Sequence, residues 1–230
     1  MSLSKRLSLI GGMVEPGSRV CDVGTDHGYL PAFLYKSGRC ASVCATDIRE
    51  KPLLSARKNL AAAGADGVKL YLCDGLEKIT RDMADTVIIA GMGGEVISGI
   101  IERASFLRDT GVTLILQPTT SADKLRVFLA ENGFCVLCEK AVEENGILYS
   151  VMKCAFCGMA YRVDGARKYT GLIKPGYDEG RAYIEKQYAI IKKRVCELKK
   201  ANKNALRYNE DVMILSELER LLGEGEKNGV

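Results

Sequence analysis

The chain has 230 residues, 47% of them hydrophobic, enough for one substantial core and a smaller additional unit. No run of eighteen apolar residues and no basic-then-apolar leader occurs, so we expect no membrane span or secretion signal, and a cytoplasmic protein. The nine cysteines are then expected to be free thiols in a reducing compartment. The formal net charge of +4 is mild, and its distribution along the chain is more informative than its total.

Short β-rich runs alternate with stretches of helical length through the first 132 residues. The predicted strands are 18–23, 41–47, 68–73, 85–90 and 111–117, and the predicted helices are 30–37, 50–63, 94–107 and 121–132. This alternation is typical of βαβ units around a parallel sheet with helices on both faces.

The next stretch, 133–154, is predicted to form two strands joined by a polar turn with "ENG" at its tip. The fold class is therefore α/β: a seven-stranded, mostly parallel Rossmann-like sheet that ends in an antiparallel hairpin. The pattern changes near residue 160, so we expect one domain over 1–160 and a second unit over 161–230.

The second unit has heptad spacing in two segments, which predicts a coiled-coil-like helical hairpin connected by 199–211. The seam residues are Ile184, Tyr188, Ile191, Val195 and Leu198 in the first helix and Leu215, Leu218 and Leu222 in the second. Residues 181–207 carry nine basic and two acidic side chains, a net charge of +7, whereas 208–230 carry two and six, a net charge of −4. The basic helix is either a solvated coiled-coil face or a contact surface for a polyanion.

A glycine-bearing turn follows the first predicted strand in "VCDVGTDHGYLP", which also holds the only histidine of the chain. Gly24 and Gly28 allow a ligand to approach the backbone closely, and the helix that follows directs its positive end at that ligand. Asp26 stands where the G-x-G-x-x-G pattern of dinucleotide-binding folds has its second glycine. Because a carboxylate there repels phosphate, the turn favours a neutral or cationic ligand.

S-adenosylmethionine has these properties, since its sulfonium is positive and it carries no phosphate. Asp22 ends the first predicted strand and is a candidate to hold its amino group. Asp47 ends the second strand, where an acidic residue accepts hydrogen bonds from ribose hydroxyls, and Asp74 follows the third strand, where it can accept from the adenine amine. The alternative is that these aspartates only cap helices or start turns.

The fourth predicted strand ends in "IAGMGGEVI", whose glycines leave open backbone beside the donor and whose Met92 can pack on it. A simple tight turn before the next helix is the alternative. This strand end lacks the Asn/Asp-Pro-Pro-aromatic tetrapeptide of many enzymes that methylate exocyclic amines. A different nitrogen is therefore the predicted acceptor.

Together, "RLSLI", "CDVGTDHGYLP", "ATDI", "CDGL", "IAGMGGEVI" and "LQPTT" resemble the bacterial tRNA adenine-N1 methyltransferases that modify position 22, and the resemblance extends over essentially the whole chain. It implies a class I methyltransferase fold, S-adenosylmethionine as donor and tRNA as substrate. The implied donor-binding residues are Asp22, Gly24, Asp47, Asp74, Gly75, Gly91 and Met92, and we expect the neighbouring Thr25, Gly28 and Ile48 to bind the donor as well. The implied catalytic residues, on the motif that faces the target base, are Asp26, His27 and Tyr29.

Adenine N1 is already nucleophilic, so the enzyme must expose the base and align N1 with the methyl carbon. Asp26 is the candidate to stabilise the positive charge that develops on the ring, and Tyr29 can stack on the flipped base. His27 either hydrogen-bonds a loop or positions the base. The expected substrate-binding residues are Arg6, Gln117, Pro118, Lys192, Lys193, Arg194, Lys199 and Lys200. The alternative for "LQPTT" is a proline-stopped strand followed by a helix cap.

Two Cys-x2-Cys pairs, Cys135/Cys138 and Cys154/Cys157, have the spacing of zinc ribbons. The first pair lies in a predicted strand, where residues three apart point to opposite faces, and folding the hairpin brings Cys135 near Cys154. We expect thiols that pack in the strands and no metal site. The alternative is a metal site or a redox-active pair.

Two other functions stay open. The first is methylation of a small molecule or protein, with the tail used for dimerisation, against which the basic cluster of the tail argues. The second is a non-catalytic RNA-binding module that keeps a methyltransferase fold and shows donor binding without turnover. For the favoured tRNA methyltransferase we expect no membrane contact and no obligatory protein partner.

Overall fold

The computed structural model describes residues 3–201 and 204–227. The strands are β1 Arg19–Val23, β2 Ser42–Asp47, β3 Lys69–Leu72, β4 Thr86–Gly93, β5 Thr113–Thr120, β6 Phe134–Glu144 and β7 Ile147–Phe156. The helices are α1 Lys5–Gly12, α2 Tyr29–Lys36, α3 Glu50–Ala62, α4 Gly94–Arg103, the 3-10 turn η1 Ser105–Arg108, α5 Ala122–Glu131, α6 Arg167–Thr170, α7 Asp178–Ala201 and α8 Ala205–Lys227. The predicted strands and helices are thus confirmed, with ends that shift by a few residues.

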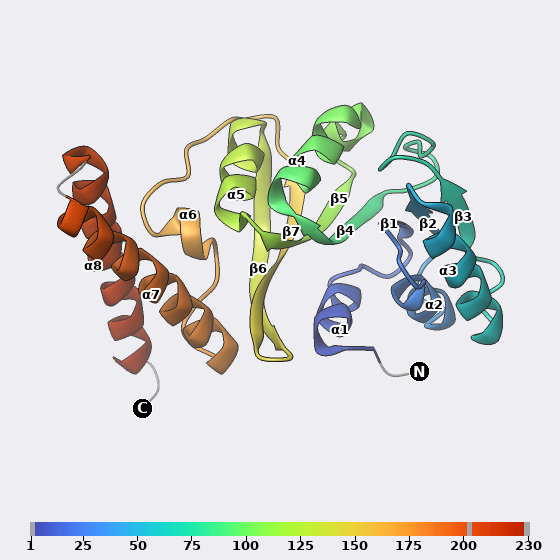
Figure 1. Cartoon of the computed structure of the whole chain (residues 1–230). Helices are drawn as coiled ribbons and strands as arrows, with labels where there is room; N and C mark the ends of the chain where they lie inside the picture. Colours follow the sequence, from blue (N-terminus) through green and yellow to red (C-terminus); the bar gives the residue numbers. More distant parts are fainter. Residues whose placement is uncertain (1–2, 202–203, 228–230) are drawn as a thin grey trace.

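The seven strands form one sheet in the order β3-β2-β1-β4-β5-β7-β6. Strands β1 to β5 pair in parallel, and β7 pairs antiparallel with both β5 and β6. The predicted mostly parallel sheet with a terminal antiparallel hairpin is therefore confirmed. The chain runs along the sheet from one end of the molecule, with β1, β2 and β3, to the other, with α7 and α8 (Figure 1).

Alternate residues of the central strands point to opposite faces of the sheet, as the period of a strand requires. On one face, Val87 and Leu114 pack with the apolar side chains of α4 and α5. On the other face, Ile88 and Ile115 pack with those of α1, α2 and α3. Both faces are therefore covered, which explains why the strands are nearly continuous apolar runs.

The helical hairpin of the tail is confirmed, but its connection is shorter than predicted. Helix α7 ends at Ala201 and α8 already starts at Ala205, so most of the predicted connection 199–211 is helical. The tail has its own apolar cluster, which includes Ile184, Ile191 and Leu218 and also takes in Ala141 of β6. The tail therefore packs on the terminal hairpin of the sheet.

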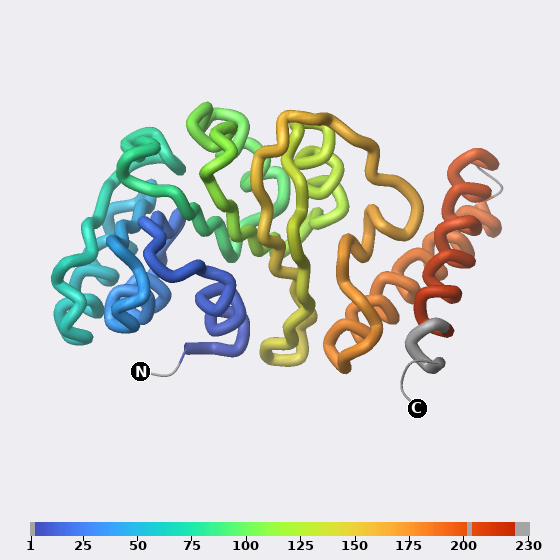
Figure 2. The backbone as a smooth tube through the Cα atoms, turned by 180° about the vertical axis from the view of Figure 1, so that it is seen from behind, coloured from blue at the N-terminus to red at the C-terminus, as the bar shows by residue number. Residues whose placement is uncertain are grey.

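Helix α1 was not predicted from the sequence. It covers the sheet near the same β6–β7 hairpin (Figure 2).

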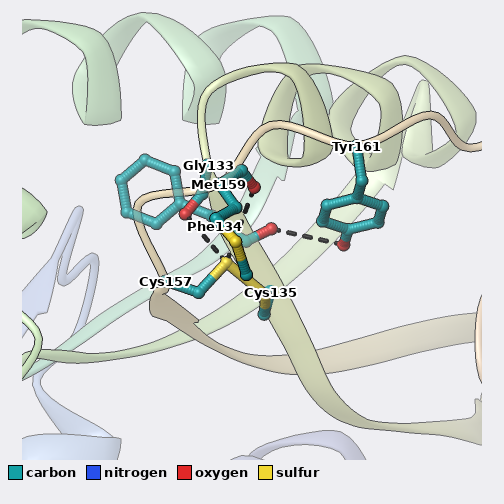
Figure 3. Close-up of a disulfide and its surroundings, with 6 residues drawn as sticks. All are labelled: Gly133, Phe134, Cys135, Cys157, Met159 and Tyr161. Carbon is teal, nitrogen blue, oxygen red and sulfur yellow. Dashed lines mark hydrogen bonds between the residues drawn. A yellow bond between two sulfur atoms is a disulfide. The ribbon is translucent and has the colours of Figure 1, made fainter.

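The expectation of free thiols is wrong for one pair. Cys135, at the start of β6, forms a disulfide with Cys157, just after β7 (Figure 3). The predicted neighbour, Cys154, lies opposite Val136 in the ladder and stays a free, buried thiol. The reason is the register: Cys135 stands opposite Ala155, so its sulfur meets the residue two positions beyond that partner.

Among the residues that the structure describes, no helix combines the length and the apolar character needed to cross a membrane.

Candidate functional site

The candidate site lies where the strand order reverses. Strand β1 is hydrogen-bonded to β2 on one side and to β4 on the other. From β1 the chain proceeds through β2 to the edge strand β3, and it then returns past β1 to β4 and the other half of the sheet. In open α/β sheets the crevice at such a point, beyond the carboxyl ends of the strands, is where ligands bind. The predicted glycine turn is the β1–α2 connection and therefore stands in this crevice.

The glycine turn is closed by β2 and β4. The N–H groups of Gly24 and Thr25 both donate to the carbonyl oxygen of Thr46, at 2.8 and 3.0 Å. Gly24 has φ +77°, and a Cβ there would collide with the terminal methyl of Met92. Gly28 has φ +70° and contacts Ala56 of α3 closely. Both positions need glycine for their backbone conformation, Gly28 has in addition little room for a side chain beside Ala56, and Met92 lies beside the turn as expected.

Asp22 is a buried carboxylate at the end of β1. Burial raises its pKa to about 6, although a hydrogen bond from the Thr25 hydroxyl acts in the opposite direction. A buried carboxylate is stabilised by a nearby positive charge. Asp22 is therefore a strong partner for the ammonium group of a ligand.

Asp47 and Asp74 lie at the ends of β2 and β3 but differ in exposure. Asp47 is buried, and its Oδ1 accepts a hydrogen bond of 2.8 Å from the Arg49 N–H, which fixes the carboxylate at the strand end. Asp74 is half exposed and both its oxygens lie 3.2 Å from a guanidinium nitrogen of Arg103. Two of the expected donor-binding residues adjoin them: Ile48 is exposed, and the carbonyl of Gly75 accepts a hydrogen bond of 2.8 Å from the Thr46 hydroxyl.

Asp26, His27 and Tyr29 are grouped on the outer side of the same turn. Asp26 Oδ2 lies 3.3 Å from His27 Nε2, and the side chains of these residues are 67% and 50% exposed. The imidazole stacks on the Tyr29 ring with centroids 5.5 Å apart, and its Nδ1 lies 3.2 Å from the Ser55 hydroxyl. His27 is thus oriented from three sides while Asp26 stays open to a substrate.

Arg6, Gln117 and Gly91 form a third group, which the sequence did not predict as a unit. Gln117 is fully buried, and its Oε1 accepts hydrogen bonds from the Arg6 guanidinium at 2.6 Å and from the Gly91 N–H at 3.1 Å. Arg6 also pairs with Glu144, near the tip of the β6–β7 hairpin, at 3.0 Å. The N-terminal helix and the hairpin are therefore tied to the end of β4, and Pro118 follows Gln117 along the same edge.

Helix α7 lies beyond the β6–β7 hairpin, on the side away from β1, β2 and β3 (Figure 1). Lys192, Lys193, Lys199 and Lys200 are exposed. Arg194 differs, because its side chain is three-quarters buried between Asp211 of α8 and the Tyr169 hydroxyl, with which it makes an ion pair and a hydrogen bond. Its hydrogen bonds to Asp211 hold the pKa of Arg194 above its usual value. Its observed contacts join the helices of the tail.

A buried ion pair that sequence reasoning missed connects the sheet to the tail. Arg126 of α5 and Glu139 of β6 are 2% and 0% exposed, with a shortest distance of 2.6 Å. Arg126 also donates to the carbonyl oxygens of Lys168 and Tyr169, and Glu139 accepts from the Leu172 N–H at 3.1 Å. Burial disfavours the charge of Arg126, but Glu139 and Tyr183 more than compensate, so the pKa of Arg126 stays above its usual value.

No cluster of three or more His, Cys, Asp or Glu side chains within the described part of the chain could hold a metal ion. Cys135 and Cys157 are bonded to each other, whereas Cys138 and Cys154 remain free.

Comparisons with known proteins agree with this geometry. The profile of the methyltransferase domain family matches residues 3–152. The Bacillus subtilis tRNA (adenine(22)-N(1))-methyltransferase is 33% identical over 153 residues, which are 66% of this chain and 64% of that protein. The alignment thus spans just under two thirds of that relative's length. A Mycoplasma pneumoniae protein named provisionally as a tRNA methyltransferase is 30% identical over 65% of this chain and 70% of its own length.

Solved structures match over nearly the whole chain, tail included. A Streptococcus pneumoniae protein described provisionally as a tRNA (m1A22) methyltransferase superposes with a TM-score of 0.82 at 29% identity, over 96% of this chain and 100% of that one. Its complex with S-adenosyl-L-methionine gives a TM-score of 0.78 at 28% identity, over 96% and 100% of the two chains. The chain belongs to the methyltransferase domain family, within the group that includes the tRNA (adenine(22)-N1)-methyltransferases.

Proposed function

We propose that this protein is a cytoplasmic tRNA methyltransferase that transfers a methyl group from S-adenosylmethionine to N1 of adenosine 22. The observation that carries the proposal is the set of carboxylates at the ends of β1, β2 and β3 around a glycine turn that itself holds an aspartate. Such a site suits a cationic nucleoside better than a dinucleotide. The names of the B. subtilis and S. pneumoniae relatives supply the base and its position.

In the proposed donor site, each of three aspartates binds a different group of the ligand. S-adenosylmethionine supplies an electrophilic methyl carbon on a sulfonium. The buried Asp22 holds the ammonium group, the fixed carboxylate of Asp47 accepts from the ribose hydroxyls, and Asp74 accepts from the adenine amine after Arg103 gives way. Met92 packs beside Gly24 and closes the site on the β4 side.

The acceptor site needs to position a base that is already nucleophilic. Asp26 is exposed next to the donor turn, so its carboxylate can face the adenine ring and stabilise the positive charge that methylation leaves there. The stacked pair of His27 and Tyr29 offers a flat surface for the flipped base. Gln117, held by Arg6 and Gly91, limits the pocket on the opposite side.

The tail contributes RNA affinity. Lys192, Lys193, Lys199 and Lys200 are exposed on α7, where they can contact phosphates and release counterions. The affinity for a tRNA that contacts both the crevice and α7 should fall more steeply with salt concentration than the affinity for the target nucleotide alone.

The test is methyl transfer from labelled S-adenosylmethionine to an unmodified tRNA transcript, with the product nucleosides resolved by mass and retention. We expect N1-methyladenosine with adenosine at position 22 and none when that base is guanosine. Transfer to another base, or donor binding without any transfer, would contradict the proposal.

The role of Asp26 is tested in the same assay with Asp26→Asn. We expect kcat to fall by roughly 10²-fold with unchanged donor affinity, because the charge that stabilises the methylated ring is lost. Full turnover in this variant would show that the carboxylate has no electrostatic role.

A further inference from the structure

Strands β5 and β7 separate beyond their last shared pair. Their ladder runs from Thr113 and Ala155 to Leu116 and Met152. Past this point β5 continues beside β4 as far as Thr120, and the segment of β7 from Ile147 to Val151 has no β5 partner. A groove of about 330 Å³ lies between the end of β5, this part of β7, and α7. We call it the β5–β7 groove.

The β5–β7 groove adjoins the acceptor site. Pro118, which follows the buried Gln117, lines one end of it. Tyr149 also lines it and carries the guanidinium of Arg6 above its ring at 5.6 Å. Since Arg6 also hydrogen-bonds to Gln117, it connects Tyr149 of the groove to the proposed acceptor site.

The lining of the groove is rich in hydroxyls and aromatic rings and nearly neutral. The hydroxyls of Thr119 and Thr120 and the rings of Tyr149, Tyr169 and Tyr183 line it. Its two arginines are neutralised by Glu139 and Asp211, and its one carboxylate is that of Asp123. Lys186, in contrast, donates a hydrogen bond of 3.1 Å to the neutral carbonyl of Leu148, and it has no carboxylate partner within the described part of the chain.

Ser150 is the residue that indicates a ligand site in this groove. It is 2% exposed, lines the groove, and its Oγ has no hydrogen-bond partner among the described residues. A buried hydroxyl without a partner is destabilising and rare in proteins, so a partner from outside the chain is the natural explanation. The start of α5 also faces the groove, because Ser121 and Ala122 line it and no side chain caps that helix.

We propose that the β5–β7 groove binds an unstacked nucleotide next to the adenosine that is methylated. Tyr149 or Tyr169 stacks on its base, the Ser150 hydroxyl turns toward the groove and hydrogen-bonds to the edge of that base, and Lys186 lies near its phosphate. Proteins read single-stranded RNA by this combination of stacking and edge contacts, and the volume lies in the range of about 300–1,000 Å³ typical of small-ligand sites. The inference rests on the proposed function, since it assumes an RNA substrate.

The first test uses Ser150→Ala in the full-length protein. We expect the KM for tRNA to rise about 5- to 10-fold with unchanged affinity for S-adenosylmethionine. We also expect no loss of thermal stability, because the substitution removes a buried hydroxyl that has no partner in the protein. Ser42→Ala, at an exposed position at the start of β2, is the control and should change neither quantity.

The second test combines a lysine substitution in the groove with altered tRNA transcripts. Lys186→Gln should raise the KM for tRNA several-fold, whereas Lys58→Gln, an exposed lysine on α3, should not. Two further tRNA transcripts lack the base directly before or directly after position 22. One of them should be a weaker substrate than intact tRNA for the wild-type protein. On that transcript Ser150→Ala should cause no further loss, because the contact that it removes is already absent.

Direct binding of tRNA, followed by fluorescence anisotropy without donor, separates the two proposals. If Ser150→Ala and Lys186→Gln bind and methylate tRNA like wild type, the groove does not hold a nucleotide while the proposed function stands. If the wild-type protein does not bind tRNA at all, the proposed function fails and the groove assignment fails with it. The groove assignment would also be overturned if Ser150→Ala raised the KM by the same factor on intact tRNA and on each of the two transcripts that lack the base before or after position 22.

Discussion

The crevice at β1 and the helical tail are held in place by different kinds of interaction. In the crevice, functional side chains follow one another within single turns, as Asp22, Asp26 and Tyr29 do after β1. The tail is held by charged pairs between separate elements: the Arg126–Glu139 pair of α5 and β6 hydrogen-bonds to backbone groups of residues 168–172, and Arg194 of α7 pairs with Asp211 of α8. The glycine turn is thus set by residues close together in the sequence, whereas the placement of the tail helices depends on contacts between separate elements.

The comparisons with known proteins divide along the same line. The family profile ends at residue 152, and the curated relatives align with about two thirds of the chain. The solved structures superpose on 96% of it. The tail therefore keeps its shape where its sequence matches less.

The largest effect is expected from the ion pair that joins the two regions. Arg126→Ala leaves Glu139 charged and buried without its partner, which costs about 3–5 kcal/mol. The free energy of unfolding from denaturant titration measures this loss. Arg126→Met with Glu139→Leu is the matched control, since a well-packed apolar pair should recover most of the stability.

If the two regions are independent, the Arg126→Ala protein, assayed below its unfolding temperature, should retain donor affinity and lose affinity for tRNA. Loss of both to the same extent would mean that the tail and the crevice form one cooperative unit.

The Cys135–Cys157 disulfide should have the next largest effect. It closes a loop with a sequence separation of 22, for which loop-closure entropy gives about 3 kcal/mol of stabilisation. Reduction should therefore lower the Tm by roughly 6–12 °C. Cys135→Ser should remove this response, whereas Cys196→Ser, at an exposed free thiol, should keep it. Equal Tm values before and after reduction would show that the bond does not constrain the unfolded chain.

On the donor side, Asp47→Ala should weaken S-adenosylmethionine binding by roughly 10- to 150-fold, the usual value of a lost charged hydrogen bond of about 1.5–3 kcal/mol. Affinity for tRNA should not change, because the basic helix lies at the other end of the molecule. Calorimetric titration measures the first and anisotropy the second. Asp66→Ala, an exposed carboxylate after α3, is the control. A parallel loss of tRNA affinity would show that the two regions are coupled.

The sequence predicted the crevice better than the tail for a physical reason. Strand ends and turns have short-range signals, so Asp22, Asp47 and Met92 could be placed from alternation and glycine spacing alone. Arg6 and Glu144 are 138 residues apart, and nothing in either segment indicates that they meet at Gln117. Arg126 and Glu139 look like surface charges, because charged residues are rarely buried without a partner and the sequence does not show the partner.

The disulfide was missed for a similar reason. Residues 135–157 suggested a hairpin, but only the register of the ladder decides whether Cys135 faces Cys154 or Cys157. A shift of one residue would exchange the faces of the strand, and the sequence does not fix the register to that accuracy. The absence of an export signal then favoured free thiols, an expectation that the geometry of this pair contradicts.

The smallest effect concerns the pH dependence of donor binding. The pKa of Asp22 is raised from 3.8 to about 6, so between these values the folded protein binds a proton that the unfolded chain has released. The contribution of Asp22 to stability therefore falls as the pH rises from about 4 to 6 and stays reduced above it. Asp22→Asn should consequently be more stable than wild type at pH 8 and should bind S-adenosylmethionine more weakly.

The ligand ammonium requires the ionised carboxylate, so in wild type the dissociation constant of the donor should rise about tenfold per pH unit below pH 6. Calorimetric titrations from pH 5 to 8 measure this slope, which should vanish in Asp22→Asn. A slope that persists in the variant would assign the titration to another group near the turn. In that case the buried carboxylate would stabilise the empty turn rather than the bound donor, and the donor site would depend on Asp47 and Asp74 alone.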